Sequence, residues 1–157
     1  MGEGAAVAPP PLQFVAVGRV QDGTTMASHC AIDDVERQRQ IREMFGKLIG
    51  AAQRKLQPSQ RQRLEWHNGS VCCLMDPQGA HLFSVVTSSI DYPERAAFQL
   101  LQELGVLIQS LDAEAGDEQA LAEEKLRHRM AALLENYQDL EAPSSSHMAL
   151  SVAKSVM

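Results

Sequence analysis

The chain has 157 residues, of which 20 are acidic and 14 basic, and its formal net charge is −6 at pH 7. Hydrophobic residues make up 45% and charged residues 22%, which is typical of a single globular domain with its own core. The acidic balance and the 4% aromatic content argue against nucleic acid as a partner, because such proteins need basic surfaces and stacking rings.

The termini carry none of the common targeting signals. No run approaches the roughly 20 apolar residues that span a bilayer, and the N-terminus lacks the basic and apolar regions of a secretory signal. We therefore expect this chain to be soluble, with residues 1–11 as a flexible lead-in. The three cysteines are Cys30, Cys72 and Cys73, an odd number that favours a reducing compartment over a disulfide framework.

The first third of the chain predicts a hairpin and a long helix. Residues 12–20 and 24–30 are predicted strands, joined by a turn at Gln21-Asp22-Gly23. Asp33 and Glu36 have the spacing of a capping box, which predicts a helix over residues 33–56 that Pro58 prevents from continuing. Its apolar residues recur with a period of 3.6: Ile41, Met44, Phe45, Leu48, Ile49, Ala52 and Leu56.

Three strands joined by short turns are predicted next. Residues 62–67 alternate, with Leu64 and Trp66 on one face, and Asn68-Gly69 is predicted to turn the chain into a strand at 70–75. The continuous apolar run of that strand indicates burial on both faces. Residues 76–79 form a predicted turn before a strand at 81–87, so the three strands make an antiparallel meander.

The remainder is predicted to be helical. Asp91, Pro93 and Glu94 mark a helix start, and Gly116 and Asp117 separate this helix from a last one. A Pro/Ser-rich linker follows at 143–146. The two apolar faces comprise Ala97, Leu100, Leu101, Leu104, Leu107, Ile108 and Leu111, and then Leu121, Leu126, Met130, Leu133, Leu134 and Tyr137. The predicted order β-β-α-β-β-β-α-α indicates an α+β domain with an antiparallel sheet.

A basic stretch stands out in this acidic chain. Residues 37–63 contain eight Lys or Arg and one acidic residue, Glu43. The stretch is either a solvated helix face or a docking surface for an acidic partner or lipid headgroups.

Motifs for catalysis are not found in the sequence. It has no Gly-rich phosphate loop, no H-x-x-x-H, no C-x-x-C and no calcium-loop pattern. Cys72 and Cys73 should point to opposite faces of a strand and so chelate one metal poorly, although a Cys–His pair could still assemble from distant residues. We predict that the chain is not an enzyme and uses no metal or cofactor.

A specific resemblance appears after the predicted strand at 81–87. The block Tyr-Pro-Glu-Arg-Ala-Ala-Phe at 92–98, followed by a Leu-rich helix, resembles the segment that opens the second helix of longin domains. The predicted element order also matches that family. The resemblance covers residues 12–141 and implies the profilin-like longin fold, in which a five-stranded antiparallel sheet is sandwiched by one helix on one face and two on the other.

The resemblance implies a function in membrane traffic. Longin domains occur at the N-terminus of R-SNAREs, which are proteins similar to vesicle-associated membrane proteins, and Leu150, Ala153 and Met157 have the spacing of a heptad seam. Residues 142–157 are thus expected to be a linker and the truncated start of a SNARE motif. The expected role is regulation of vesicle trafficking and membrane fusion at the cytoplasmic face of endomembranes. The alternatives are a free-standing longin-fold subunit of a tethering or coat complex, and an enzyme on a similar sandwich.

The resemblance also implies a site, namely a groove between the first helix and the third strand. It would bind the domain's own SNARE motif, cognate SNAREs, or coat, adaptor and tethering factors, with membrane attachment only through a C-terminal anchor absent from this chain. The residues expected to line it are Met44, Leu48, Ala51, Leu64 and Trp66. For Met44, Leu64 and Trp66 the alternative interpretation is simple core packing.

Overall fold

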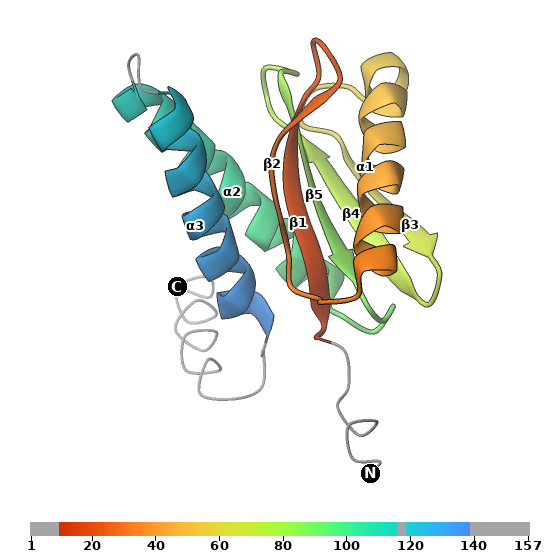
Figure 1. Cartoon of the computed structure of the whole chain (residues 1–157). Coiled ribbons are helices and arrows are strands. Elements are labelled where there is room, and N and C mark those ends of the chain that lie inside the picture. The colour runs from red at the N-terminus through yellow and green to blue at the C-terminus, as the bar shows by residue number, and fades with distance from the viewer. Residues whose placement is uncertain (1–9, 116–118, 139–157) are drawn as a thin grey trace, which may run out of the picture.

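A computed structural model of the chain describes residues 10–115 and 119–138, and Figure 1 shows a layered α+β arrangement. The elements in chain order are β1 (Leu12–Arg19), β2 (Thr24–Cys30), α1 (Val35–Lys55), β3 (Arg61–Trp66), β4 (Gly69–Met75), β5 (His81–Thr87), α2 (Glu94–Ala115) and α3 (Gln119–Gln138). The predicted element order is confirmed, as is the α+β class.

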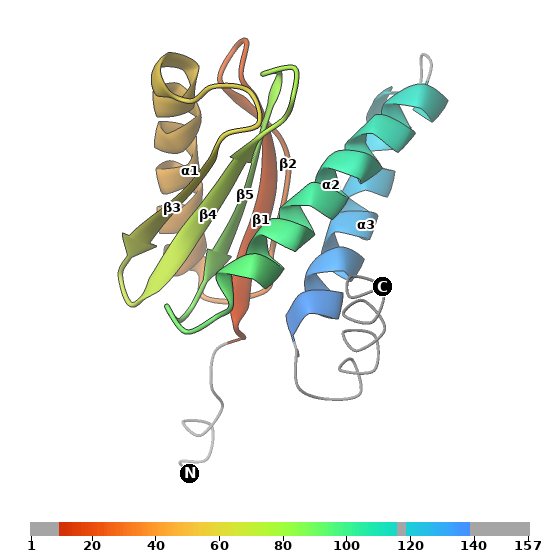
Figure 2. The same cartoon turned by 180° about the vertical axis from the view of Figure 1, so that it is seen from behind.

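One sheet organises the molecule. Its five strands lie in the order β2-β1-β5-β4-β3, and every neighbouring pair is antiparallel. The helix α1 covers one face, while α2 and α3 cover the other, as the two opposite views show (Figures 1 and 2). The strands β2 and β3 are therefore the two edges of the sheet.

The strands β1, β4 and β5 have two buried faces, which explains their continuous apolar sequences. Successive side chains of β4 alternate between two cores: Cys72 packs in the core under α2 and α3, and Cys73 in the core under α1. In β1 a register shift lies between Leu12 and Phe14, so these two residues enter opposite cores although they are two positions apart.

The start of α1 differs from the prediction by one residue. Asp34, not Asp33, is the N-cap, and its Oδ1 accepts hydrogen bonds from the backbone N–H groups of Glu36 (3.1 Å) and Arg37 (3.2 Å). Glu36 then lies too early for a capping box, and its carboxylate instead pairs with Arg39. The predicted apolar face is confirmed, because Ile41, Phe45, Ile49 and Ala52 are buried.

The β3–β4 turn also differs from the prediction. The two-residue loop is His67-Asn68, with His67 at φ 57°. Gly69 is already the first residue of β4 and pairs with Trp66, the last residue of β3. The reason is a contact with β5: a Cβ atom at residue 69 would lie 2.0 Å from the carbonyl oxygen of Thr87. Gly69 therefore serves a close approach of two backbones and not a turn.

The start of α2 was also predicted too early. The helix begins at Glu94, and its first hydrogen bond joins the N–H of Ala97 to the carbonyl of Pro93. Asp91 lies too far ahead to cap it. The predicted apolar faces of α2 and α3 are buried at every described position except Leu107 and Leu133, which are partly buried against the same core.

Several predictions fall outside the described residues. They are the first nine residues of the lead-in, the break at Gly116-Asp117, the linker at 143–146 and the SNARE-like segment at 150–157. At the other end of the predicted lead-in, the carbonyl of Pro11 accepts a hydrogen bond from the N–H of Ser88 and so joins the sheet.

Candidate functional site

The residues predicted to line a groove come from α1 and from the edge strand β3. In β3, Leu64 pairs with Val71 and Trp66 pairs with Gly69, and Val71 belongs to the core under α1. Because directly paired residues share a face, Leu64 and Trp66 both face the α1 side of the sheet. The alternation predicted for this strand is confirmed.

The helix contributes the other wall. Met44, Leu48 and Ala51 follow one another at spacings of four and three along one flank of α1, and all three are half-buried. The fully buried residues Ile41, Phe45 and Ile49 lie on the neighbouring stripe that packs against the sheet. The flank therefore belongs to the boundary between the core and solvent.

The predicted residues differ in whether they pack against the core under α1. Met44, Leu48 and Trp66 pack against the same apolar cluster, whereas Ala51 and Leu64 are outside it. Leu64 remains 36% exposed, which is unusual for a leucine beside a core. We call these five partly exposed residues, on one flank of α1 and on the α1-facing side of β3, the α1–β3 strip.

Trp66 has a stacking partner that the sequence did not reveal. The Arg37 guanidinium carbon lies 4.8 Å from the centroid of the Trp66 ring, and Arg37 Nη2 also donates to Gln13 Oε1 (3.4 Å). The first turn of α1 is thereby linked to the end of β3. A sequence signal existed in the basic stretch, but only the register of α1 shows which arginine faces the ring.

The edge of β3 is a second feature of the site. In the part of the chain that the structure describes, β3 pairs only with β4, so its outer N–H and C=O groups are unpaired by any strand. Five of its six residues are exposed. Such an edge can accept an added strand from a partner.

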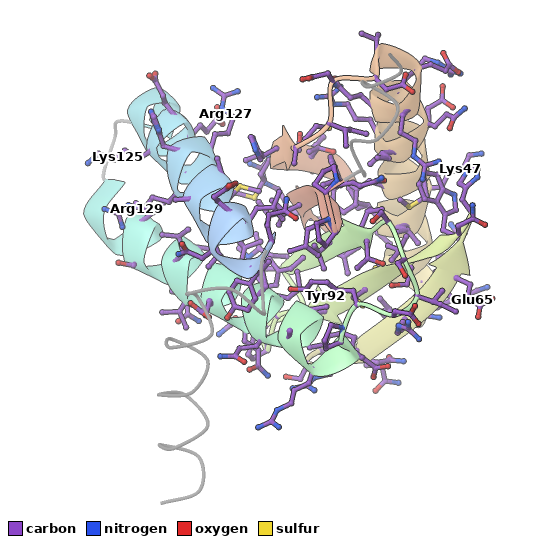
Figure 3. All side chains as sticks on the ribbon, turned by 90° about the horizontal axis from the view of Figure 1, so that it is seen from below. Lys47, Glu65, Tyr92, Lys125, Arg127 and Arg129 are labelled. Atoms are coloured by element: carbon purple, nitrogen blue, oxygen red, sulfur yellow. The ribbon has the colours of Figure 1, made fainter. Side chains whose placement is uncertain are left out.

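The electrostatics of α1 are less uniform than the charge count suggests. Arg39 is paired with Glu36 and with Glu43, and these two carboxylates hold its pKa above the ordinary value. Lys47, Arg54 and Lys55 are exposed, and Figure 3 shows Lys47 and Glu65 on one side of the molecule, with Lys125, Arg127 and Arg129 of α3 on the other. A partner of the strip would meet a positive rim on its helix side.

The titratable core groups do not form a reactive cluster. Burial raises the pKa of Cys72 and raises that of Cys73 to about 12, so both thiols stay protonated at neutral pH. Among the side chains that the structure describes within residues 10–115 and 119–138, no three His, Cys, Asp or Glu gather as a metal site would require. Within the same residues, no helix is both long and apolar enough to cross a membrane.

Comparisons with known proteins add no identification, since no family model and no curated protein matches the chain. A functional assignment therefore depends on the fold and the strip.

Proposed function

We propose that this chain is a longin-type interaction domain, the regulatory N-terminal domain of an R-SNARE acting in vesicle trafficking and membrane fusion. The observation that carries the proposal is the α1–β3 strip, a partly exposed apolar surface beside an open sheet edge. The proposed place of action is the cytoplasmic face of endomembranes, and the proposed partners are SNARE motifs, coats, adaptors and tethers.

The fold supports the proposal through its order of elements and its layers. One helix on one face and two on the other, around five antiparallel strands, is the arrangement that the longin resemblance implies. The Tyr-Pro-Glu-Arg-Ala-Ala-Phe block opens α2 shortly after β5, as the resemblance requires.

The block itself has a packing role. The Tyr92 hydroxyl donates to the carbonyl of Tyr137 (2.8 Å), and Ala96, Ala97 and Phe98 are buried. These contacts hold the start of α2 against the end of α3 and the sheet. The block therefore supports the proposed fold family, whereas the proposed function depends on the strip.

The mechanism is binding and not catalysis. An amphipathic segment could bury the exposed parts of Leu64, Met44 and Trp66, and each would gain only a fraction of the roughly 1.5–3 kcal/mol that complete burial of a large apolar side chain gives, because all three are already partly buried. An extended partner could also pair with the free edge of β3. In a closed state the chain's own SNARE motif would cover the strip, and in an open state the strip would be free. A sorting factor that binds the strip would compete with the SNARE motif and shift the population towards the open state.

The test is a pair of variants on opposite faces of the sheet. Leu64→Ser combined with Trp66→Ala removes the most exposed apolar part of the strip. The matched control is Val106→Ser, which changes a residue of α2 that is 66% exposed on the other face. We expect the double variant to stay folded at a cost of about 1–3 kcal/mol, because Trp66 loses its packing and Arg37 its ring.

The readout is the set of proteins that the immobilised chain retains from a cell extract with solubilised membranes, identified by mass spectrometry. We expect SNARE, coat, adaptor or tether proteins among those retained by the wild type and Val106→Ser but lost with the double variant. Tether or coat subunits without any SNARE would favour the free-standing subunit instead. If the double variant unfolds, the two residues are core; the proposal is then judged on Leu64→Ser alone, and it is wrong if that variant retains every partner.

A further inference from the structure

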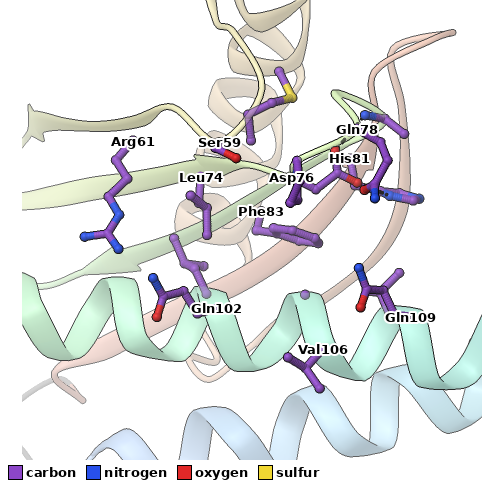
Figure 4. Close-up of a pocket in the computed structure, with 16 residues that line it drawn as sticks. Ser59, Arg61, Leu74, Asp76, Gln78, His81, Phe83, Gln102, Val106 and Gln109 are labelled. Atoms are coloured by element: carbon purple, nitrogen blue, oxygen red, sulfur yellow. Dashed lines mark hydrogen bonds and ion pairs between the residues drawn. The ribbon is translucent and has the colours of Figure 1, made fainter. Parts of the chain in front are cut away.

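A cavity lies on the face of the sheet opposite the α1–β3 strip. Its volume is about 630 Å³, and it is bounded by α2, by the adjoining ends of β4 and β5, and by the start of β3 (Figure 4). This size is typical of small-molecule sites, which are mostly apolar with a few polar groups. The apolar wall is formed mainly by Leu74, Phe83, Leu101, Val106 and Ile108.

The cavity lies beside the place where α2 packs against β5. Gly105 of α2 lies close to Phe83, because a Cβ atom at residue 105 would be only 3.3 Å from the Phe83 ring, and this tight contact forms part of the wall. Val106 is 66% exposed at the rim, and Leu74 is half-buried. Apolar surface is therefore open to solvent over a concave area, which favours a bound apolar molecule.

Two arginines of β3 point toward this face, and they differ in how they are held. Arg63 donates to the carbonyl of Ile90 (3.0 Å) and lies 3.8 Å from a Glu94 carboxylate oxygen. Arg61 lies over the Phe98 ring, 5.2 Å from its centroid, and forms no ion pair with any described side chain. Arg61 and Gln102 lie at the same end of the cavity in Figure 4.

The opposite end of the cavity offers no free negative charge. The Asp76 carboxylate accepts from the Ala80 N–H (2.7 Å) and lies 2.9 Å from His81 Nδ1. Its two oxygens are thus both engaged by the protein. Of the described charges around the cavity, the Arg61 guanidinium is the one that lacks an oppositely charged partner.

We propose that this cavity binds an elongated apolar molecule that carries one carboxylate at its end, the chemistry of a fatty acid. The carboxylate would meet the Arg61 guanidinium and the Gln102 amide, which suit an anionic oxygen acceptor. The hydrocarbon would run along α2 over Leu74 and Phe83 toward Gln109. From Gln102 to Gln109 the helix advances about 10 Å, which sets the scale of the chain that fits.

The inference is separate from the proposed function, because the two surfaces lie on opposite faces of the sheet. It is tested on the full chain with octanoate, decanoate and dodecanoate below their micelle concentrations, by calorimetry and methyl NMR. We expect the affinity to rise about fourfold for each added methylene until the cavity is full. The methyl resonances of Leu74, Leu101 and Val106 should move, while those of Leu64 should not.

Head-group specificity is the sharper test. Decanol should bind at least about tenfold more weakly than decanoate, because it cannot form the charge-assisted hydrogen bonds with Arg61. Arg61→Met should lower decanoate affinity by about tenfold or more and leave decanol affinity unchanged. The matched control Arg63→Met, on the same face of β3, should retain decanoate binding.

A second variant keeps the proposal falsifiable if Arg61→Met is poorly folded. Val106→Glu places a carboxylate at the exposed rim and should weaken decanoate binding, whereas Leu64→Ser on the opposite face should not. Equal binding of decanoate and decanol would overturn the proposal, and so would the absence of saturable binding. Movement of the same methyl resonances on dilution of the protein alone would assign the cavity to a contact between copies and overturn it as well.

Discussion

At the scale of single residues, the three cysteines differ in how deeply their side chains are buried. Cys72 and Cys73, in the inner strand β4, are 1% and 2% exposed, whereas Cys30 is half-buried at the end of the edge strand β2. Burial raises the pKa of all three thiols, and Arg42 opposes this effect at Cys30. Accessibility therefore decides their relative reactivity.

We predict that iodoacetamide at about pH 8 alkylates Cys30 at least about tenfold faster than Cys72 or Cys73 in the folded chain. Alkylation of the two buried thiols requires opening of the sheet, which is rare in a stable domain. Peptide mapping by mass spectrometry gives the three rates, and in urea all three should converge. Fast native labelling of Cys73 would show that β4 is not a protected inner strand of the sheet.

At the scale of elements, α1 provides a matched pair of neighbouring aspartates. Asp34 caps the helix through two hydrogen bonds to its first turn, while Asp33 makes no cap contact. We predict that Asp34→Ala lowers the free energy of unfolding by about 1 kcal/mol and that Asp33→Ala changes it by less than about 0.5 kcal/mol. Urea denaturation measures both. The reverse order would restore the capping box predicted from the sequence.

Two glycines give opposite predictions for the same substitution. Gly69→Ala should destabilise the fold by about 2–3 kcal/mol or more, because the new methyl group would collide with the backbone of Thr87. Gly46→Ala should stabilise it by about 0.5–1 kcal/mol, since nothing lies within 4 Å of that position and alanine favours the helix. Thermal and urea unfolding report both values. A neutral Gly69→Ala would mean that β4 and β5 are further apart than described.

These elements show where sequence reasoning was sufficient. The burial of β4 follows from its continuous apolar run and the amphipathic face of α1 from its period of 3.6, so both could be predicted. The N-cap of α1 and the residues of the β3–β4 loop could not be predicted, because in each case neighbouring residues fit the local pattern equally well. Gly69 is fixed by a contact with Thr87, which is 18 positions away in the chain.

At the scale of the whole molecule, the α1–β3 strip and the cavity differ in how far each could be predicted from the sequence. The α1–β3 strip combines one flank of a helix with one face of a strand, and both patterns are visible in the sequence. The cavity could not be predicted, because its wall joins residues from β3, β4, β5 and α2, and the close approach of Gly105 to Phe83 depends on how α2 packs on the sheet. The polar end of the cavity likewise needs Arg61 of β3 and Gln102 of α2 on the same side of one cavity (Figure 4).

One side-chain amide joins the end of α3 to the start of β1. The Gln138 side chain, at the end of α3, donates from Nε2 to the carbonyl of Leu12 (2.7 Å) and accepts at Oε1 from the Leu12 N–H (2.8 Å). These bonds join the start of β1 to a residue 126 positions later. A similar side chain exists on the other face, where Gln53 of α1 donates to the carbonyl of Val20.

We predict that Gln138→Ala lowers the free energy of unfolding by about 1–2 kcal/mol, because two partly buried backbone groups lose their partner. Hydrogen exchange should show faster exchange of amides in the last turns of α3, while the amides of α1 keep their protection. Gln53→Ala should give the reciprocal pattern, with a smaller cost because its single bond is exposed to solvent. Uniform loss of protection in both variants would show that the two helical layers open together, in which case the strip and the cavity could not be regulated independently.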